Sequence, residues 1–157
     1  MPDPLRFRMA AAKISPGNTH DYNGPGEWSA DQVVHRYQCI CRALGKDPRA
    51  IKPGIHKEKG VTRIFPVMDS VIEAANDGDL SALELCLQLI EVDNSMPFGM
   101  ILKSRAARAL KRNAAVLTRS QRSRIENRVS DMIARDYRPR EFQEYVKLER
   151  RLTQATE

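Results

Sequence analysis

The chain has 157 residues, of which 41% are hydrophobic and 29% charged, and its formal net charge is +6. This length and composition suit one globular domain that folds without disulfides or metals, and they argue against wholesale disorder. No apolar run approaches the roughly 18 to 20 residues of a membrane span, and the N-terminal stretch lacks the apolar core of a secretory signal. We therefore expect a cytoplasmic protein without membrane contact.

The basic charge is concentrated at the two ends of the chain. Residues 1–60 hold ten Lys/Arg and six Asp/Glu, residues 61–100 hold one and seven, and residues 101–157 hold fifteen and seven. A basic surface attracts nucleic acid, anionic membranes or acidic proteins, and charge alone does not choose among them.

The cysteines favour a reducing compartment. Cys39, Cys41 and Cys86 are an odd number at spacings that match no disulfide framework. His35 and Cys39 lie one helical turn apart, but no second ligand pair completes a tetrahedral metal site. We predict no metal and no cofactor.

The first 27 residues are rich in proline and glycine, and they predict a flexible basic N-terminal arm. A helix is expected from "WSADQ", where Ser29 is the N-cap, to Gly45, a typical C-cap. Residues 28–153 are predicted to form a single helical domain, followed by a C-terminal tail at 154–157.

The stretch "GIHKEKGVTRIF" is compatible with a small β-hairpin near residues 53–65. Together with the preceding helix, this region loosely resembles a helix-turn-helix module with a basic wing. That resemblance implies a recognition helix in the major groove of DNA, with flanking elements on the phosphates.

From Pro66 onward the pattern predicts consecutive helices joined by short loops. Gly78 ends the first, and Asp79 or Ser81 caps the second, which is apolar around most of its circumference and predicts a central buried helix. The stretch "SVIEAANDGDLSALELCLQLIEVDN" resembles the helix, Gly-Asp turn and second helix of an ankyrin repeat. It covers one unit that does not recur, so we infer no function from it.

Three more helices follow, near residues 98–113, 118–135 and after Pro139. In the first, Phe98, Leu102 and Ala106 belong to an apolar arc opposite a basic face, and in the second Thr118 and Gln121 predict a capping box. Pro97 and Pro139 lie 42 residues apart, within the range of two-helix solenoid repeats. Without matching residues between the two units, we predict instead an all-α or mostly α irregular multi-helix bundle of about five helices.

The segment "KSRAARALKRN" carries the clearest functional pattern. Helices 98–113 and 118–135 are joined by a short loop, which favours antiparallel neighbours, so that their basic residues would share one surface. Arginine, which dominates this set, binds phosphate oxygens in a bidentate way. The candidate nucleic-acid-binding residues are Arg105, Arg108, Lys111, Arg112, Arg119, Arg122, Arg124 and Arg128.

These residues predict a non-catalytic protein that binds DNA or RNA through phosphate contacts. A plain solvated face is the ordinary alternative, because most amphipathic helices have one. The other alternative is a protein-interaction module, bound to an acidic partner or homodimeric, in which basic and acidic segments pair. We expect no enzyme, since none of the nucleophile-elbow, phosphate-loop, dinucleotide or zinc-protease motifs is present.

Overall fold

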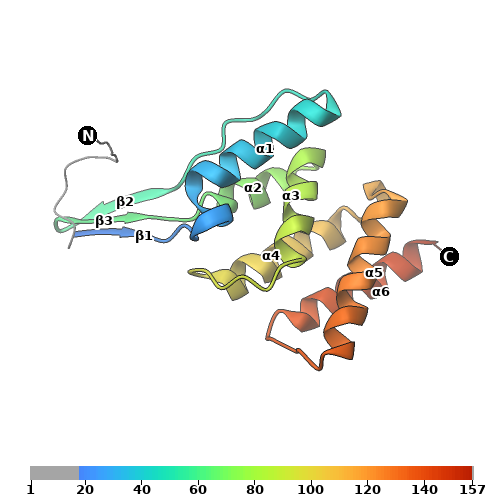
Figure 1. Ribbon diagram of the computed structural model, residues 1–157. Helices are drawn as coiled ribbons and strands as arrows, with labels where there is room; N and C mark the ends of the chain where they lie inside the picture. The colour runs from blue at the N-terminus through green and yellow to red at the C-terminus, as the bar shows by residue number, and fades with distance from the viewer. Residues whose placement is uncertain (1–17, 157) are drawn as a thin grey trace.

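The computed structural model describes residues 18–156 and shows a mostly helical protein with one small sheet (Figure 1). Residues 1–17, which make up most of the predicted N-terminal arm, lie outside the described residues. The strands are β1 (Thr19–Asp21), β2 (Ile55–Glu58) and β3 (Val61–Ile64). The helices are α1 (Ala30–Leu44), α2 (Met68–Asn76), α3 (Leu80–Ile90), α4 (Gly99–Arg112), α5 (Arg119–Ala134) and α6 (Phe142–Thr156), with short 3₁₀ turns η2 (Gly26–Trp28) and η3 (Ala114–Val116).

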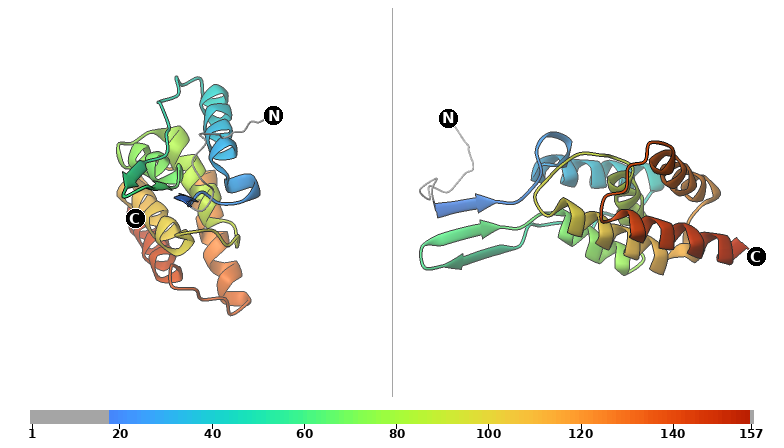
Figure 2. Two further views of the ribbon diagram at one scale, coloured as in Figure 1. Left: turned by 90° about the vertical axis from the view of Figure 1, so that its left-hand side faces the viewer. Right: turned by 90° about the horizontal axis from the view of Figure 1, so that it is seen from below.

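The predicted hairpin is confirmed as β2 and β3, which pair antiparallel. Lys59 and Gly60 connect them with φ angles of 53° and 77°. Positive φ at both positions matches the two-residue turn whose twist suits antiparallel strands. β1, within the stretch predicted as an irregular arm, adds to β3 in parallel, and the sheet extends away from the helices (Figure 2).

Asn23, just after β1, joins the start of the described chain to the short connection between β3 and α2. Its side chain accepts a hydrogen bond from the backbone N–H of Val67 at 2.7 Å and donates to the carbonyl of Phe65 at 3.4 Å. Residues 46–54 form no helix, so the arrangement of a helix-turn-helix with a wing is not present in this part of the chain.

The predicted helix termini agree closely with the structure. Ser29 accepts a hydrogen bond from the N–H of Gln32 at the start of α1, and Gly45 ends that helix with φ 68°. Asp79 caps α3 by accepting from the N–H of Ala82. Thr118 and Gln121 form the expected capping box of α5. These signals are local, and for this reason the sequence reveals them.

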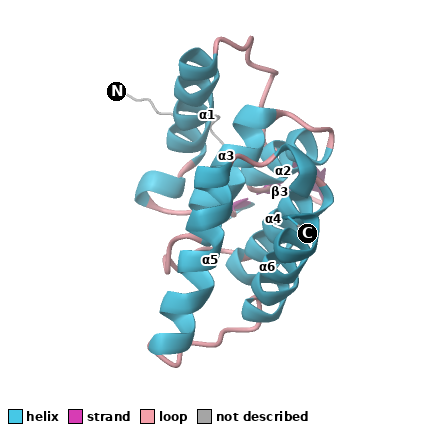
Figure 3. Ribbon diagram, turned by 90° about the vertical axis from the view of Figure 1, so that its right-hand side faces the viewer, coloured by secondary structure: helices cyan, strands magenta, loops and turns pink. Residues whose placement is uncertain are grey.

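The helices form two layers, with α1, α3 and α5 in one and α2, α4 and α6 in the other (Figure 3). α4 packs against α2 and α6 in its own layer and against α3 in the other layer. α5 packs against α3 in its own layer and against α6 in the other layer. The predicted multi-helix bundle is therefore a stack of three helix pairs. Pro66, Pro97 and Pro139 each precede a helix of the α2–α4–α6 layer.

α3 is the central helix, as predicted. It contacts α1, α2, α4 and α5, and its buried residues are Ser81, Ala82, Leu83, Leu85, Cys86, Leu87, Leu89 and Ile90. Phe98, expected in the apolar arc of its helix, is instead 43% exposed, and Ile133 is 49% exposed. Phe98 lies at the N-cap of α4, where its ring contacts Tyr22, and Ile133 lies in the last turn of α5.

Candidate nucleic-acid interface

The predicted basic patch does not form one surface, because α4 and α5 are not packed side by side. Four of its eight residues are engaged inside the fold. Arg105 forms an ion pair with Asp69 at the start of α2. Arg124 forms ion pairs with Glu84 at 2.9 Å and Glu91 at 2.6 Å, which join α5 to α3.

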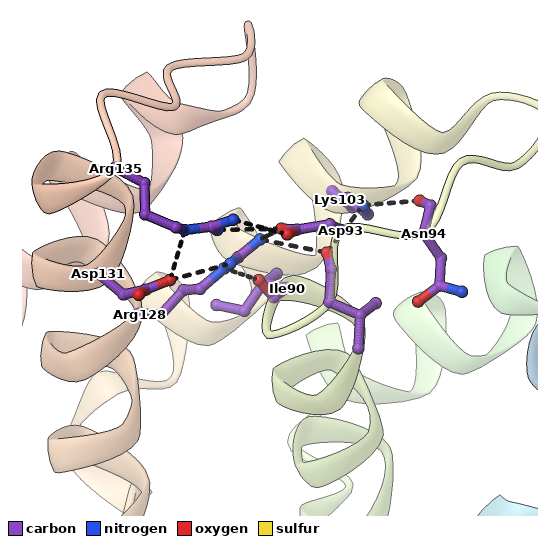
Figure 4. Close-up of polar contacts among 8 residues, drawn as sticks. Ile90, Asp93, Asn94, Lys103, Arg128, Asp131 and Arg135 are labelled. Carbon is purple, nitrogen blue, oxygen red and sulfur yellow. Dashed lines mark hydrogen bonds and ion pairs between the residues drawn. The ribbon is translucent and has the colours of Figure 1, made fainter.

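Arg128 is the most deeply buried member of the predicted patch, with 8% of its surface exposed. It donates hydrogen bonds to the carbonyls of Ile90 at 2.7 Å and Val92 at 3.2 Å, and to Asp93 at 2.7 Å (Figure 4). Arg135 reaches the same aspartate at 3.1 Å. These bonds fix the end of α3 against α5, and they occupy the guanidinium group of Arg128 within the fold.

Arg122 stabilises the connection between α4 and α5. Its guanidinium donates to the carbonyl of Ala114 at 2.7 Å, to that of Leu117 at 3.2 Å and to that of Leu152 at 3.5 Å. Since η3 lies in this connection, the bonds hold α5 at the angle that separates it from α4. The charge of Arg122 thus serves the fold.

The acidic middle of the chain is the counterpart of these arginines. Hydrogen bonds from Arg128 and Arg135 lower the pKa of Asp93. Burial raises the pKa of Glu84, but bonds from Arg124 and the neighbouring glutamines outweigh burial, and the net shift is downward. Both carboxylates are held in their charged form, which favours pairing within the chain.

The remaining residues of α4 face a different neighbour from the one expected. Arg108, Lys111 and Arg112 lie beside α6 and share with it a hollow of about 520 Å³, which we call the basic groove. Its lining residues are Arg108, Lys111, Arg112, Lys147, Arg150, Arg151 and Gln154. Sequence reasoning missed the three from α6, although positions 147, 150 and 151 have the spacing of one helix face.

The basic groove carries excess positive charge. Glu144 lies beside it and contacts both Arg108 and Lys147 at 3.6 Å. Arg112, Arg150 and Arg151 are exposed and have no side-chain partner among residues 18–154. Arg119, the last of the predicted residues, is exposed at the start of α5 and lines a separate hollow of about 300 Å³.

α4 and α6 run side by side in the same direction. The C-terminal halves of both helices line the basic groove, while their N-terminal turns line a second hollow between them. Cations near a helix C-terminus interact favourably with the helix dipole, so part of this charge stabilises the helices. The groove nevertheless gathers six cationic side chains on one accessible surface.

Further features of the described residues concern thiol chemistry, metal binding and membranes. Cys41 and Cys86 are buried, and burial raises the pKa of the Cys86 thiol to about 12. The Sγ atom of Cys39 lies 3.5 Å from His35 Nε2. Within the described part of the chain no three His, Cys, Asp or Glu residues come together as a metal site would require. None of the helices described there combines the length and apolar character needed to cross a bilayer.

No protein-family profile, curated protein or solved structure matches this chain.

Proposed function

We propose that this protein is a non-catalytic nucleic-acid-binding protein and that it holds phosphates in the basic groove between α4 and α6. The observation that carries the proposal is the convergence of three cationic residues from α4 with three from α6 on one groove. Two helices that the chain separates by some thirty residues contribute equally to this surface. Nucleic-acid affinity depends chiefly on such phosphate neutralisation.

The chemistry of the groove suits phosphodiesters. Four of its six cations are arginines, whose planar guanidinium groups bind phosphate oxygens through two parallel hydrogen bonds. Arg112, Arg150 and Arg151 form no bonds with the described side chains that a phosphate would have to break. The predicted residues Arg105, Arg122, Arg124 and Arg128 are not part of this proposal, because they do not line the basic groove and they bind groups of the protein itself.

The intramolecular ion pairs also weigh against basic and acidic segments pairing between two copies of the chain. Asp69, Glu84, Glu91 and Asp93, which that alternative needs, already hold arginines of their own chain. An acidic protein partner in the basic groove is the alternative that the binding experiment tests.

The test is fluorescence anisotropy of the nuclease-treated protein with labelled duplex DNA, single-stranded DNA and RNA across a salt series. If about five phosphates are neutralised, log K should fall against log salt with a slope of roughly −4 on duplex. The double variant Arg112→Glu with Arg151→Glu should weaken binding by at least about tenfold and reduce the slope.

Arg119→Glu is the matched control for the single variant Arg112→Glu, because each reverses one exposed arginine and only Arg112 lines the basic groove. It should change affinity less than threefold. Equal losses in the two variants would contradict the assignment of the groove. Absence of binding to all three nucleic acids at low salt would overturn the proposed function and favour an acidic protein.

A further inference from the structure

The second hollow between α4 and α6 lies at their N-terminal ends and has a volume of about 1020 Å³, at the upper end of the range for ligand sites. We call it the N-terminal groove. It is bounded by the α3–α4 loop, the first turn of α4 and the α5–α6 loop with the start of α6. Its lining includes the exposed apolar side chains of Phe98, Met100 and Ile101.

Glu141 gives this groove an unused hydrogen-bond acceptor. The residue is only 6% exposed, and its Oε1 atom is buried with no hydrogen-bond partner among the described residues. A buried carboxylate oxygen without a donor is costly, so such a group indicates a missing partner. The hydroxyl of Tyr145, in the first turn of α6, is also buried and has no hydrogen-bond partner in the described part of the chain.

Lys103 supplies a donor to the same groove. Its ammonium group, on a residue 3% exposed, donates to the carbonyls of Val92 and Asn94, each at 3.0 Å (Figure 4). An ammonium has three N–H bonds, so one remains for a ligand. Burial lowers the pKa of Lys103, and the nearby Glu141 carboxylate opposes that shift. An acceptor and a donor therefore both line the groove.

The start of α4 favours a negatively charged group in the groove. This helix has no side-chain cap, and the N–H groups of Met100 and Ile101 have no acceptor among the described residues. Phe98 holds the N-cap in the left-handed region at φ 59°, a strained conformation for a bulky residue. Free N–H groups at a helix N-terminus favour an anion, and the neighbouring Arg138 and Arg140 also line the groove.

We propose that the N-terminal groove binds a guanine nucleotide, free or as an unpaired guanosine of a strand. The Watson–Crick edge of guanine presents two adjacent N–H donors, which match the Glu141 carboxylate, and next to them an oxygen acceptor for Lys103. The phosphate fits the start of α4 and the two arginines, and the ring fits the apolar wall. Adenine places an acceptor nitrogen where guanine has a donor, so it would face the carboxylate unfavourably.

The experiment is isothermal titration of the full chain with GMP, AMP and inorganic phosphate. GMP should bind at least about tenfold more tightly than AMP, and AMP more tightly than phosphate. Glu141→Gln, which puts an amide in place of the carboxylate, should remove the preference for GMP. Glu149→Gln makes the same substitution within α6, outside the groove, and should leave the preference for GMP unchanged.

Arg140→Glu changes an exposed side chain, so it tests the phosphate end without risk to folding, and it should weaken GMP and AMP alike. The basic-groove variant Arg112→Glu with Arg151→Glu should bind GMP normally, so the two proposals fail or succeed separately. An oligouridine with one guanosine should outcompete plain oligouridine if the source is a strand. No GMP binding at millimolar concentration, or equal binding of GMP and AMP, would overturn the proposal and leave buried water as the partner of Glu141.

Discussion

Arg128 shows how one residue that resembles a surface cation becomes part of the core. Its guanidinium bonds two carbonyls at the end of α3 and the Asp93 carboxylate. Arg128→Ala should lower the free energy of unfolding by about 2 to 4 kcal/mol, because it removes these hydrogen bonds and leaves the buried Ile90 carbonyl without its side-chain donor. Urea denaturation measures this, with Arg119→Ala, an exposed residue, expected within about 0.5 kcal/mol of the parent protein. A small effect of Arg128→Ala would contradict the structural role.

The ion pair of Asp93 with Arg128 and Arg135 makes the stability of the protein depend on pH. Its pKa is lowered in the folded state by Arg128 and Arg135, so its contribution to stability is full above the pKa of the unfolded chain, about 4. That contribution disappears as the pH falls through the lower, folded pKa. Asp93→Asn should therefore reduce stability at pH 7 and narrow the difference from the parent below about pH 3. A constant difference between pH 7 and pH 2 would argue against this ion pair.

At the scale of the element, the helices begin where side chains satisfy their first N–H groups. In α5 the Thr118 hydroxyl accepts from the N–H of Gln121 at 3.1 Å, and the Gln121 side chain accepts from the N–H of Thr118 at 2.9 Å. Thr118→Ala should cost about 1 kcal/mol of stability in urea denaturation, whereas Thr118→Ser keeps the acceptor and should cost little. Equal losses would indicate that the threonine methyl group, rather than the cap, matters.

At the scale of the whole molecule, stability depends on the central position of α3 between the two layers. Leu87 is fully buried in that helix. Leu87→Ala should lower the free energy of unfolding by about 2 to 5 kcal/mol, through lost apolar contact and the cavity that remains. Ile133→Ala is the comparison, since this residue is 49% exposed and its truncation should cost far less stability. Similar losses at both positions would be inconsistent with this packing.

The candidate interface belongs to the same scale. A short α4–α5 connection favoured antiparallel neighbours, but η3 and the bonds of Arg122 turn the chain from one layer into the other. α4 consequently lies beside α6, and its basic face meets Lys147, Arg150 and Arg151. Half of the predicted site residues, Arg105, Arg122, Arg124 and Arg128, are used inside the fold.

The sequence by itself determined the features that depend on neighbours a few residues apart. The caps at Ser29, Asp79 and Thr118, the helix end at Gly45 and the Lys59–Gly60 hairpin were all predictable, because each signal and its effect lie within one turn of the chain.

Only the tertiary structure decided which helices are neighbours and which charges meet. Arg124 and Glu84 are 40 residues apart, and no local pattern records that they pair. Long-range partners depend on how the layers stack, and stacking follows from the shape of many buried contacts at once. The same stacking brings Arg112 and Arg151 to one groove, where neither has a partner among the described side chains, and it encloses Glu141. The two candidate sites therefore lie between α4 and α6.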